Sequence, residues 1–406
     1  MNDWTQCVVT PPVNSKNFAS LGVPVYRAST IPFDSAQSYA NRHAQGAEGY
    51  SYGLYGTPTS RALEHKISQL EQGIRTLLVP SGQAAITLTM MILLRPGDHV
   101  LIPDTVYPPV RDFANQELNK LGIEVTYYDP QDFDALEGLI GSKTRLVWAE
   151  SPGSTTMEVQ DIPRIVKLAH RHGALVGCDN TWATPLYFKP LIHDVDIVVE
   201  ALTKYFAGHS DVLMGSITVR DQSLAEHLRK GLGRYGVGVS PDDCSLVLRG
   251  IETMSVRLRH CSDVVSRLLP TIDRQPTVQQ ILYPALSGSP GFDLWQRDFK
   301  GASGVFSLVF TDIAAPFVAE ALDCFKTFAI GASWGAHEAS LPPCPLQCTV
   351  RRDFGKVPTS FCVLVLAWKQ KRISRLTLMH FLHIWTRAAD PSPATPPPSR
   401  RPPNDQ

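Results

Sequence analysis

The segment 196–211, DIVVEALTKYFAGHSD, decides the fold and indicates the chemistry of this chain. Its first part, DIVVEAL, is an almost continuous apolar run of strand length, and the residues that follow are mostly polar or small. Nearly uninterrupted apolar strands are typical of parallel sheets with both faces covered. Open sheets of this class bind ligands at the carboxyl ends of their strands. Lys204 therefore stands where a ligand is expected.

A second polar residue ends the preceding apolar strand. Asp179 closes the run ALVGCD within GALVGCDNTWATP. A desolvated lysine amine can act as a nucleophile and form a Schiff base. A carboxylate and an amine on successive strand ends match what pyridoxal phosphate needs, one partner for its ring nitrogen and one for its aldehyde. Taken alone, Lys204 would be read as a solvated loop lysine, and Asp179 favours the cofactor site instead.

Apolar strand and helix patterns alternate along most of the chain. This βαβ alternation predicts an α/β fold with a mostly parallel sheet and helices on both faces. A long helical pattern over 248–270 leads into a second, smaller unit, and residues 1–60 read as an irregular arm. The main segments are the helices RALEHKISQLEQ (61–72), AAITLTMMILL (84–94) and IPRIVKLAHRHG (162–173), and the strands TLLV (76–79), HVLIP (99–103), GIEVTYYD (122–129), RLVWAE (145–150), SDVLMGSITV (210–219) and GVFSLVF (304–310).

Composition is that of an ordinary globular protein, and it excludes several classes. The 38 basic and 38 acidic side chains cancel, so no overall charge favours nucleic acid. The eight cysteines show no paired C-x-x-C spacing, which argues against a zinc site, and we expect no metal. The start MNDWTQCVVTPP lacks the pattern of a secretory signal, and no apolar run reaches membrane-spanning length. We expect a cytoplasmic protein that binds neither nucleic acid nor membrane.

Further candidate residues lie at other strand ends. Ser81, Gly82 and Gln83 form a turn between a strand and a helix, and such turns direct backbone N–H groups at an anion. Thr203 offers a hydroxyl to the same anion, although a plain tight turn is an alternative for the PSG sequence. Tyr107 follows the HVLIP strand and can stack on a planar ring, or simply pack a loop.

Together, these segments resemble the Cys/Met-metabolism family of pyridoxal-phosphate enzymes. The resemblance runs from about Pro24 to Val363 and depends on many motifs in one order. The ESPGS loop (150–154) is similar to that of the β-eliminating branch of the family. The matching motifs are YRAST, YGxxGTPT, PSGxAA, DxVY, ESPGS, DNTWATP, ALTKYxxGHSD, SPDD, LRG, RDFxGASG and SWG.

The resemblance implies a fold and a role for each site residue. The fold is the aspartate-aminotransferase-like fold (fold type I), divided into an arm over 1–60 that contacts a neighbouring subunit, a cofactor domain over 61–250 and a C-terminal domain over 251–363. The cofactor would be bound to Lys204, with Asp179 at the ring nitrogen and Tyr107 stacked on the ring. The remaining implied contacts are Ser81, Gly82, Gln83 and Thr203 with the phosphate, Tyr52 with the phosphate of a neighbouring subunit, and Ser333 and Trp334 with the substrate.

The implied reaction is the α,β-elimination of L-cystathionine to homocysteine, pyruvate and ammonia in a homotetramer built from dimers that share active sites. Three alternatives stay open. A relative that performs γ-elimination or γ-replacement would release 2-oxobutyrate or a replacement product. A protein that binds the cofactor with little turnover is a second alternative. A Rossmann dehydrogenase is the third, although no G-x-G-x-x-G follows the first strand.

Two departures from the family pattern bear on activity. Leu54 stands where the family often has an arginine that pairs with the phosphate across the subunit interface. Leu364 stands where the family has the arginine that binds the substrate α-carboxylate, and the acidic helix expected after it is absent. Codons shifted by one nucleotide over 364–381 can encode RLGLEAEEDLKADLDAF. We therefore treat the tail, 364–406, as atypical, either frameshifted or disordered, and sequencing of the gene tests the frameshift.

Overall fold

The computed structural model describes residues 2–11, 20–323, 329–331, 333–334, 340–341 and 361–365. The largest element is a seven-stranded sheet with the order β1-β7-β6-β5-β4-β2-β3. Strand β7 is antiparallel to both of its neighbours, and the pairs between β2, β3, β4, β5 and β6 are parallel. The strands are β1 (Arg75–Val79), β2 (His99–Pro103), β3 (Glu124–Tyr128), β4 (Thr144–Glu150), β5 (Leu175–Asp179), β6 (Ile197–Ala201) and β7 (Gly215–Val219).

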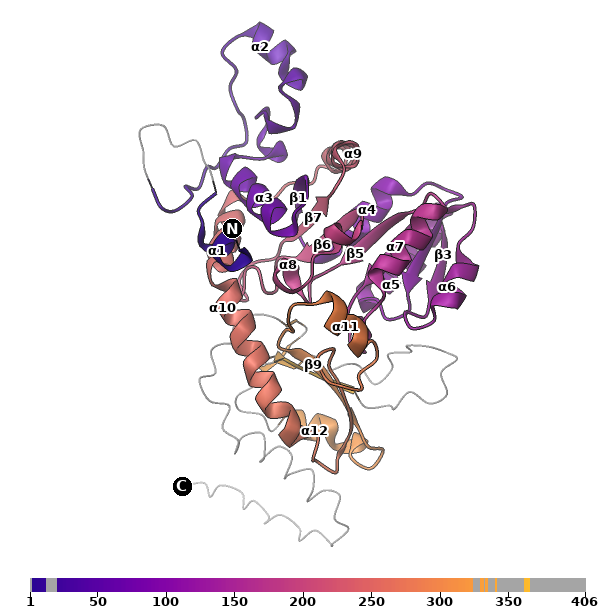
Figure 1. The fold of residues 1–406 in the computed structure, drawn as a ribbon. Coiled ribbons are helices and arrows are strands. Elements are labelled where there is room, and N and C mark those ends of the chain that lie inside the picture. The colour runs from indigo at the N-terminus through magenta and orange to yellow at the C-terminus, as the bar shows by residue number, and fades with distance from the viewer. Residues whose placement is uncertain are drawn as a thin grey trace, which may run out of the picture.

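Helices cover both faces of this sheet, as the alternation predicts (Figure 1). On one face, Ile86 and Met90 of α4 pack in a core with Val199 of β6. On the other face, Leu70 of α3 packs in a core with Val198 of β6. The helices of this layer and its connections are α3 (Pro58–Glu71), α4 (Gly82–Leu93), α5 (Pro108–Phe113), α6 (Phe133–Leu139), α7 (Ile162–Arg171), α8 (Thr184–Tyr187) and α9 (Gln222–Arg234), with the short turns η3 (Ala114–Leu118), η4 (Asn119–Leu121) and η5 (Pro190–His193).

Two local expectations needed correction. Helix α3 begins at Pro58 rather than at Arg61, because Thr57 and Ser60 form a capping box and proline suits the first turn of a helix. The strand expected over 210–219 is confined to β7 and runs antiparallel. Its five residues are all buried, so its burial pattern is the same as that of a parallel strand.

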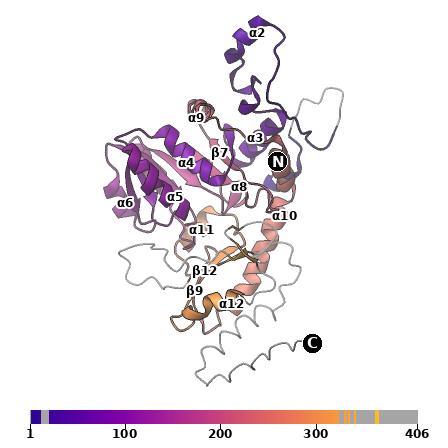
Figure 2. The ribbon, with the colours of Figure 1, turned by 180° about the vertical axis from the view of Figure 1, so that it is seen from behind.

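A long helix, α10 (Pro241–Ile272), connects this layer to a second, smaller sheet (Figures 1 and 2). That sheet has the antiparallel order β12-β9-β8. The expected domain boundary after residue 250 falls inside the continuous helix α10, and the division into domains stays our proposal. The remaining elements are β8 (Val278–Leu282), α11 (Phe292–Asp298), β9 (Val305–Phe310), η6 (Ala315–Phe317), α12 (Val318–Asp323), β10 (Ala329–Ile330), β11 (Ser340–Leu341) and β12 (Phe361–Val365).

The N-terminal segment divides into two parts. Helix α1 (Asp3–Val8) packs against α3 and α10, and Cys7 is fully buried there, so the expectation of an irregular arm fails for these residues. By contrast, α2 (Ala36–Ala40) and its flanking loops stand away from the sheet in both ribbon views (Figures 1 and 2). The turns η1 (Arg42–Glu48) and η2 (Gly53–Tyr55) lead back to α3. In the described ranges, no helix has the length and apolar character needed to cross a membrane.

Candidate active site

A cavity of about 400 Å³ lies at the carboxyl ends of β1, β4, β5 and β6. It gathers nine of the ten residues that the sequence predicts for the site, and Tyr52 is the exception. Tyr52 is 48% exposed and lies on the arm. The predicted residues around the cavity are Ser81, Gly82, Gln83, Tyr107, Asp179, Thr203, Lys204, Ser333 and Trp334.

Lys204 extends from the turn after β6 into this cavity. Its Nζ donates a hydrogen bond of 2.5 Å to Ser333 Oγ and lies 5.0 Å from the centroid of the Trp334 ring. Burial lowers the pKa of Lys204 to about 8, although the Asp179 charge acts in the opposite direction. A substantial fraction of the amine is therefore neutral near physiological pH, as a nucleophile or base requires.

Asp179 ends β5 and lies directly across from Glu150 at the end of β4. Its Oδ1 accepts a hydrogen bond of 2.9 Å from the backbone N–H of Thr181. Burial raises the pKa of Asp179, while hydrogen bonds from Thr181 and the Lys204 charge favour the carboxylate. The site thus places one partly compensated carboxylate within the electrostatic range of one lysine.

Glu150 is a cavity residue to which sequence reasoning gave no chemical role. It is 8% exposed, and its Oε2 accepts a hydrogen bond of 2.8 Å from the backbone N–H of Tyr107. Burial and the Asp179 charge raise the pKa of Glu150 well above its usual value and so favour the neutral form of the group. The signal was present in the sequence, because RLVWAE ends in an acid just as ALVGCD does.

Tyr107 borders the cavity at the start of α5. It is 39% exposed, and burial of the rest of its side chain raises the pKa of the phenol. The phenol therefore stays protonated at neutral pH and can donate a hydrogen bond.

An anion can be bound where α4 begins. Ser81 caps this helix, since its Oγ accepts a 3.0 Å hydrogen bond from the backbone N–H of Ala84. The first N–H groups of a helix have no partner within the helix and carry positive potential. A Cβ added to Gly82 would lie 2.5 Å from Cβ of Ala201, so only glycine lets this turn approach β6 so closely. Thr203 lies on the same side of the cavity, and its Oγ1 donates to the carbonyl oxygen of Met214 at 3.2 Å.

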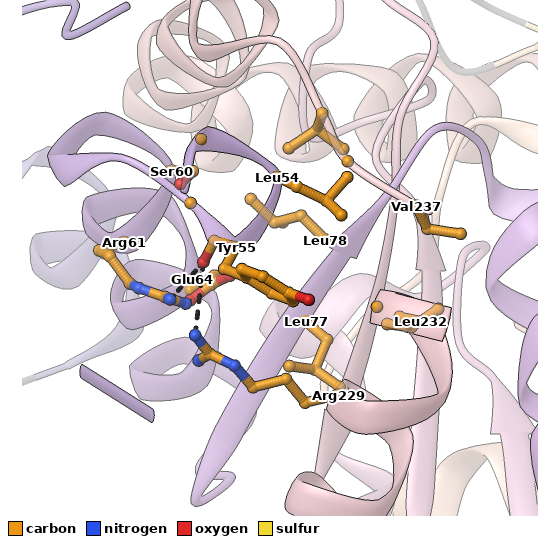
Figure 3. Close-up of a pocket in the computed structure, with 15 residues that line it drawn as sticks. Leu54, Tyr55, Ser60, Arg61, Glu64, Leu77, Leu78, Arg229, Leu232 and Val237 are labelled. Atoms are coloured by element: carbon orange, nitrogen blue, oxygen red, sulfur yellow. Dashed lines mark hydrogen bonds and ion pairs between the residues drawn. The ribbon is translucent and has the colours of Figure 1, made fainter. Parts of the chain in front are cut away.

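Leu54 lines a second cavity, of about 50 Å³, between the arm and the body. Figure 3 shows the guanidinium groups of Arg61 and Arg229 converging on the Tyr55 carbonyl oxygen beside it. Arg61 also forms an ion pair of 2.6 Å with Glu64. These two arginines hold the turn η2 on the body, so cations are present near Leu54 but bind the chain's own acceptors.

His209 lies in the turn after Lys204, and its Nδ1 is 2.6 Å from the carbonyl oxygen of Ala207, within hydrogen-bond distance. Leu364 lies in β12, opposite Phe306 of β9. The rest of the tail, 366–406, and two arginines that precede it, Arg351 and Arg352, lie outside the described residues.

The model of the family "Cys/Met metabolism PLP-dependent enzyme" matches residues 4–352. The chain belongs to this family. A cystathionine β-lyase of Haemophilus influenzae is 36% identical over 324 residues, which cover 79% of this chain and 82% of that protein. An L-alanine/L-glutamate racemase of Wolbachia pipientis is 39% identical over 340 residues, covering 80% and 82%. The crystal structure of cystathionine γ-lyase from Lactobacillus plantarum with L-serine is 25% identical, has a TM-score of 0.86 and covers 96% and 99%.

Pyridoxal 5′-phosphate is the cofactor of this family, and the residues present fit it. The cavity offers one amine at Lys204 for the aldehyde and one carboxylate at Asp179 for the ring nitrogen. The helix start at Gly82 offers N–H groups for the phosphate. The close approach of Gly82 and Ala201 leaves this end of the cavity clear of a side chain at position 82.

Proposed function

We propose that this chain is a carbon–sulfur lyase that cleaves L-cystathionine by α,β-elimination to homocysteine, pyruvate and ammonia. The observation that carries the proposal is the Lys204 amine, which has a pKa of about 8 and faces Asp179, Ser333 and Trp334 across one cavity. The name of the Haemophilus influenzae relative supports the choice of reaction.

The cofactor contacts follow from the cavity wall. Lys204 would bind the aldehyde covalently, and Asp179 would pair with the ring nitrogen. Tyr107 would stack on the ring, while Ser81, Gly82, Gln83 and Thr203 would hold the phosphate. When bound, the cofactor supplies an electron sink for the negative charge that develops at the substrate α-carbon.

The protein residues then move the protons. The Lys204 amine would be released when the substrate amine takes its place on the aldehyde, and the free amine, which lies in the cavity and has a pKa of about 8, would then take the α-proton. The departing sulfur is protonated by Lys204 or by the Tyr107 phenol, which keeps its proton at neutral pH. The hydrogen bond between Lys204 and Ser333 orients the amine, and Trp334 closes the same side of the cavity.

The substrate carboxylate poses a specific problem. Among the described cavity residues, Lys204 has the only cationic side chain, and Leu364 occupies the sequence position where the family has arginine. Substrate binding is therefore expected to be weak in the chain as given. Restoring the alternative reading frame after Val363 would supply the arginine, and the KM for cystathionine should then fall while Lys204 chemistry is unchanged.

One assay separates the reactions. The purified full chain, loaded with pyridoxal phosphate, is incubated with L-cystathionine and the keto acids are quantified. Pyruvate supports the proposal, and 2-oxobutyrate supports the γ-elimination suggested by the Lactobacillus plantarum neighbour. A loaded protein that releases neither keto acid overturns the lyase assignment. Conversion of L-alanine to D-alanine would then support a racemase like the Wolbachia relative, since removal of the α-proton is common to both reactions.

The arm is proposed to complete the active site of a second copy. Tyr52 lies away from the cavity of its own chain, which is consistent with a contact to a phosphate in a neighbouring subunit of a cytoplasmic homotetramer. Mixing inactive Lys204→Ala and Tyr52→Ala proteins tests this. Shared active sites predict partial recovery of activity in the mixture, and no recovery with a monomeric mass by light scattering would refute sharing.

A further inference from the structure

A buried arginine reaches the turn that carries Lys204 from outside the cavity. Arg257 lies on α10, the long helix that leads to the smaller sheet, and only 3% of it is exposed. Its Nη2 donates a hydrogen bond of 2.6 Å to the carbonyl oxygen of Tyr205, the residue that directly follows Lys204. The same nitrogen donates to the carbonyl oxygen of Gly250 at 2.8 Å, and Nε donates to Thr253 Oγ1 at 3.1 Å. One guanidinium therefore joins α10 to the backbone beside the reactive amine.

The charge of this arginine is not balanced by an acid. Burying a cation is costly, and a buried arginine is ordinarily paired with a carboxylate. Among the residues that the structure describes, Arg257 forms no ion pair, and its hydrogen bonds go to two carbonyl oxygens and one hydroxyl. Burial lowers the pKa of Arg257 to about 10, so the guanidinium is still charged at neutral pH. Backbone carbonyl oxygens thus stand where a carboxylate is usual.

The turn around Lys204 depends on a few backbone hydrogen bonds. The N–H of Lys204 donates to the carbonyl oxygen of Ala201 at 3.0 Å, and its own carbonyl oxygen accepts from the N–H of Gly208 at 2.8 Å. Tyr205 is 2% exposed, and a buried backbone carbonyl group needs a hydrogen-bond partner. Arg257 supplies that partner, so the turn is complete only when α10 is packed against it.

Two glycines let the turn and α10 approach each other closely. A Cβ added to Gly250 would lie 2.2 Å from the carbonyl oxygen of Ala207 and 2.4 Å from that of Phe206. A Cβ added to Gly208, where φ is +72°, would lie 2.3 Å from Cζ of Arg257. Any larger residue at either position would push the turn and the helix apart. The contact is therefore a tight one between main chains, with the guanidinium enclosed in it.

We propose that Arg257 is a positioning residue for Lys204, because its guanidinium holds the Tyr205 carbonyl group and so fixes where the amine stands in the cavity. Arg257 is not among the described residues that line the cavity, so it acts through the backbone and not on the cofactor or the substrate. The Tyr205 hydroxyl, which accepts from the N–H of Gly304 at 3.1 Å, anchors the same residue at its other end. The inference rests on the role proposed for Lys204 but not on the identity of the substrate.

The test measures covalent attachment of pyridoxal phosphate instead of turnover. The full chain and Arg257→Ala are mixed with the cofactor and reduced with borohydride at set times, and the labelled Lys204 peptide is quantified by mass spectrometry. The rate is expressed per folded molecule, with the folded fraction taken from circular dichroism. It should fall by about tenfold or more in Arg257→Ala, because a displacement of about 1 Å at a reacting group can cost about 100-fold.

The matched control is Arg267→Ala. Arg267 lies on the same helix and is exposed, and its Nε donates to a carbonyl oxygen of that helix, Asp263, at 2.9 Å. This variant should attach the cofactor at the wild-type rate. Arg257→Lys keeps a buried cation with N–H donors and should recover part of the rate lost in Arg257→Ala. Equal rates in Arg257→Lys and Arg257→Ala would overturn the role of the hydrogen bond.

A purely structural role gives a different result. It would lower the free energy of unfolding and leave the attachment rate per folded molecule unchanged, and that outcome overturns the proposal. If Arg257→Ala does not fold, Gly250→Ala decides, since it displaces the same turn and leaves Arg257 in place. A wild-type attachment rate in Gly250→Ala would then overturn the proposal.

A separate assay of pyruvate release keeps this inference apart from the proposed function. Rapid attachment in the wild type without pyruvate release would overturn the lyase assignment and leave the role of Arg257 intact. Equal attachment in the wild type and in Arg257→Ala would overturn the role of Arg257 and leave the lyase assignment intact.

Discussion

Two pairs of acidic residues lie on opposite faces of the same sheet. Glu150 and Asp179 are on the face covered by α4 and open into the cavity. Glu71 and Glu200 are on the face covered by α3 and are sealed from solvent. Burial raises the pKa of all four groups.

The two pairs differ in the lysine that lies near each of them, and this explains why only one pair belongs to the proposed active site. Lys189 gives its hydrogen bond to a carbonyl oxygen and forms an ion pair with Asp3, so it is a fixed structural cation. Lys204 projects into the cavity, where burial lowers its pKa to about 8 and Asp179 supplies the opposing charge. The pair of Glu150 and Asp179 is therefore part of the proposed active site, because the nearby Lys204 can lose a proton and reach a ligand.

The largest expected effect comes from removing that reactive cation. Lys204→Ala should abolish covalent cofactor binding and reduce pyruvate release by about 10³-fold or more, because it removes both the nucleophile and the base. Borohydride reduction followed by mass spectrometry checks the first result. Lys143→Ala, at an exposed lysine, is the control. Cofactor still bound covalently in Lys204→Ala would show that another amine is the nucleophile.

Asp179→Asn tests the charged member of the cavity pair. The substitution keeps the size of the side chain and removes the charge expected at the ring nitrogen. Loss of a charged hydrogen bond of about 2.7 kcal/mol corresponds to about 100-fold in kcat. Steady-state pyruvate release measures it, and urea unfolding checks that the fold is retained. Unchanged turnover would remove Asp179 from the proposed site.

The pH dependence of cofactor attachment reports on Lys204. Only the neutral amine attacks an aldehyde, so the attachment rate should rise by about tenfold per pH unit below pH 8 and level off above it. Stopped-flow absorbance with pyridoxal phosphate follows the rate. A rate still rising between pH 9 and pH 10 would mean that burial does not lower the lysine pKa.

The smallest effect is expected at Glu150, the other acid of the cavity pair. Burial and the Asp179 charge raise the pKa of Glu150 and favour its neutral form, which glutamine resembles, so Glu150→Gln should alter kcat by less than about fivefold, or 1 kcal/mol. Pyruvate release is compared directly with that of Asp179→Asn. Equal losses in the two variants would show that Glu150 is also charged.

The acidic pair in the cavity could be predicted from the sequence better than the buried pair of Glu71 and Glu200. Asp179 and Lys204 each follow an apolar run, and strand ends of a parallel sheet meet at one edge. Glu150 ends a strand in the same way, but its effect on Asp179 depends on β4 lying beside β5, which the periodicity does not specify. The antiparallel direction of β7 was missed for a related reason, because a fully buried strand looks the same in either direction.

The sealed pair had no sequence signal. Glu71 occupies the end of an amphipathic helix, where an acid is ordinarily solvated, and Glu200 interrupts an apolar strand. Only the packing of α3 onto the sheet brings the two together, and Lys189 and Asp3 join from still other elements. Tertiary contacts between distant segments therefore determine the environment of these two glutamates, and the local sequence pattern does not predict it.

The pairing of β12 with β9 sets a limit on shortening the chain. All six residues of β9 are buried, and β12 occupies one of its two edges. A protein that ends before Phe361 would expose a row of unpaired N–H and C=O groups along an apolar strand, which is a template for pairing with other chains. A truncation meant to remove the atypical tail should therefore retain residues through Val365, and light scattering should show that shorter versions aggregate.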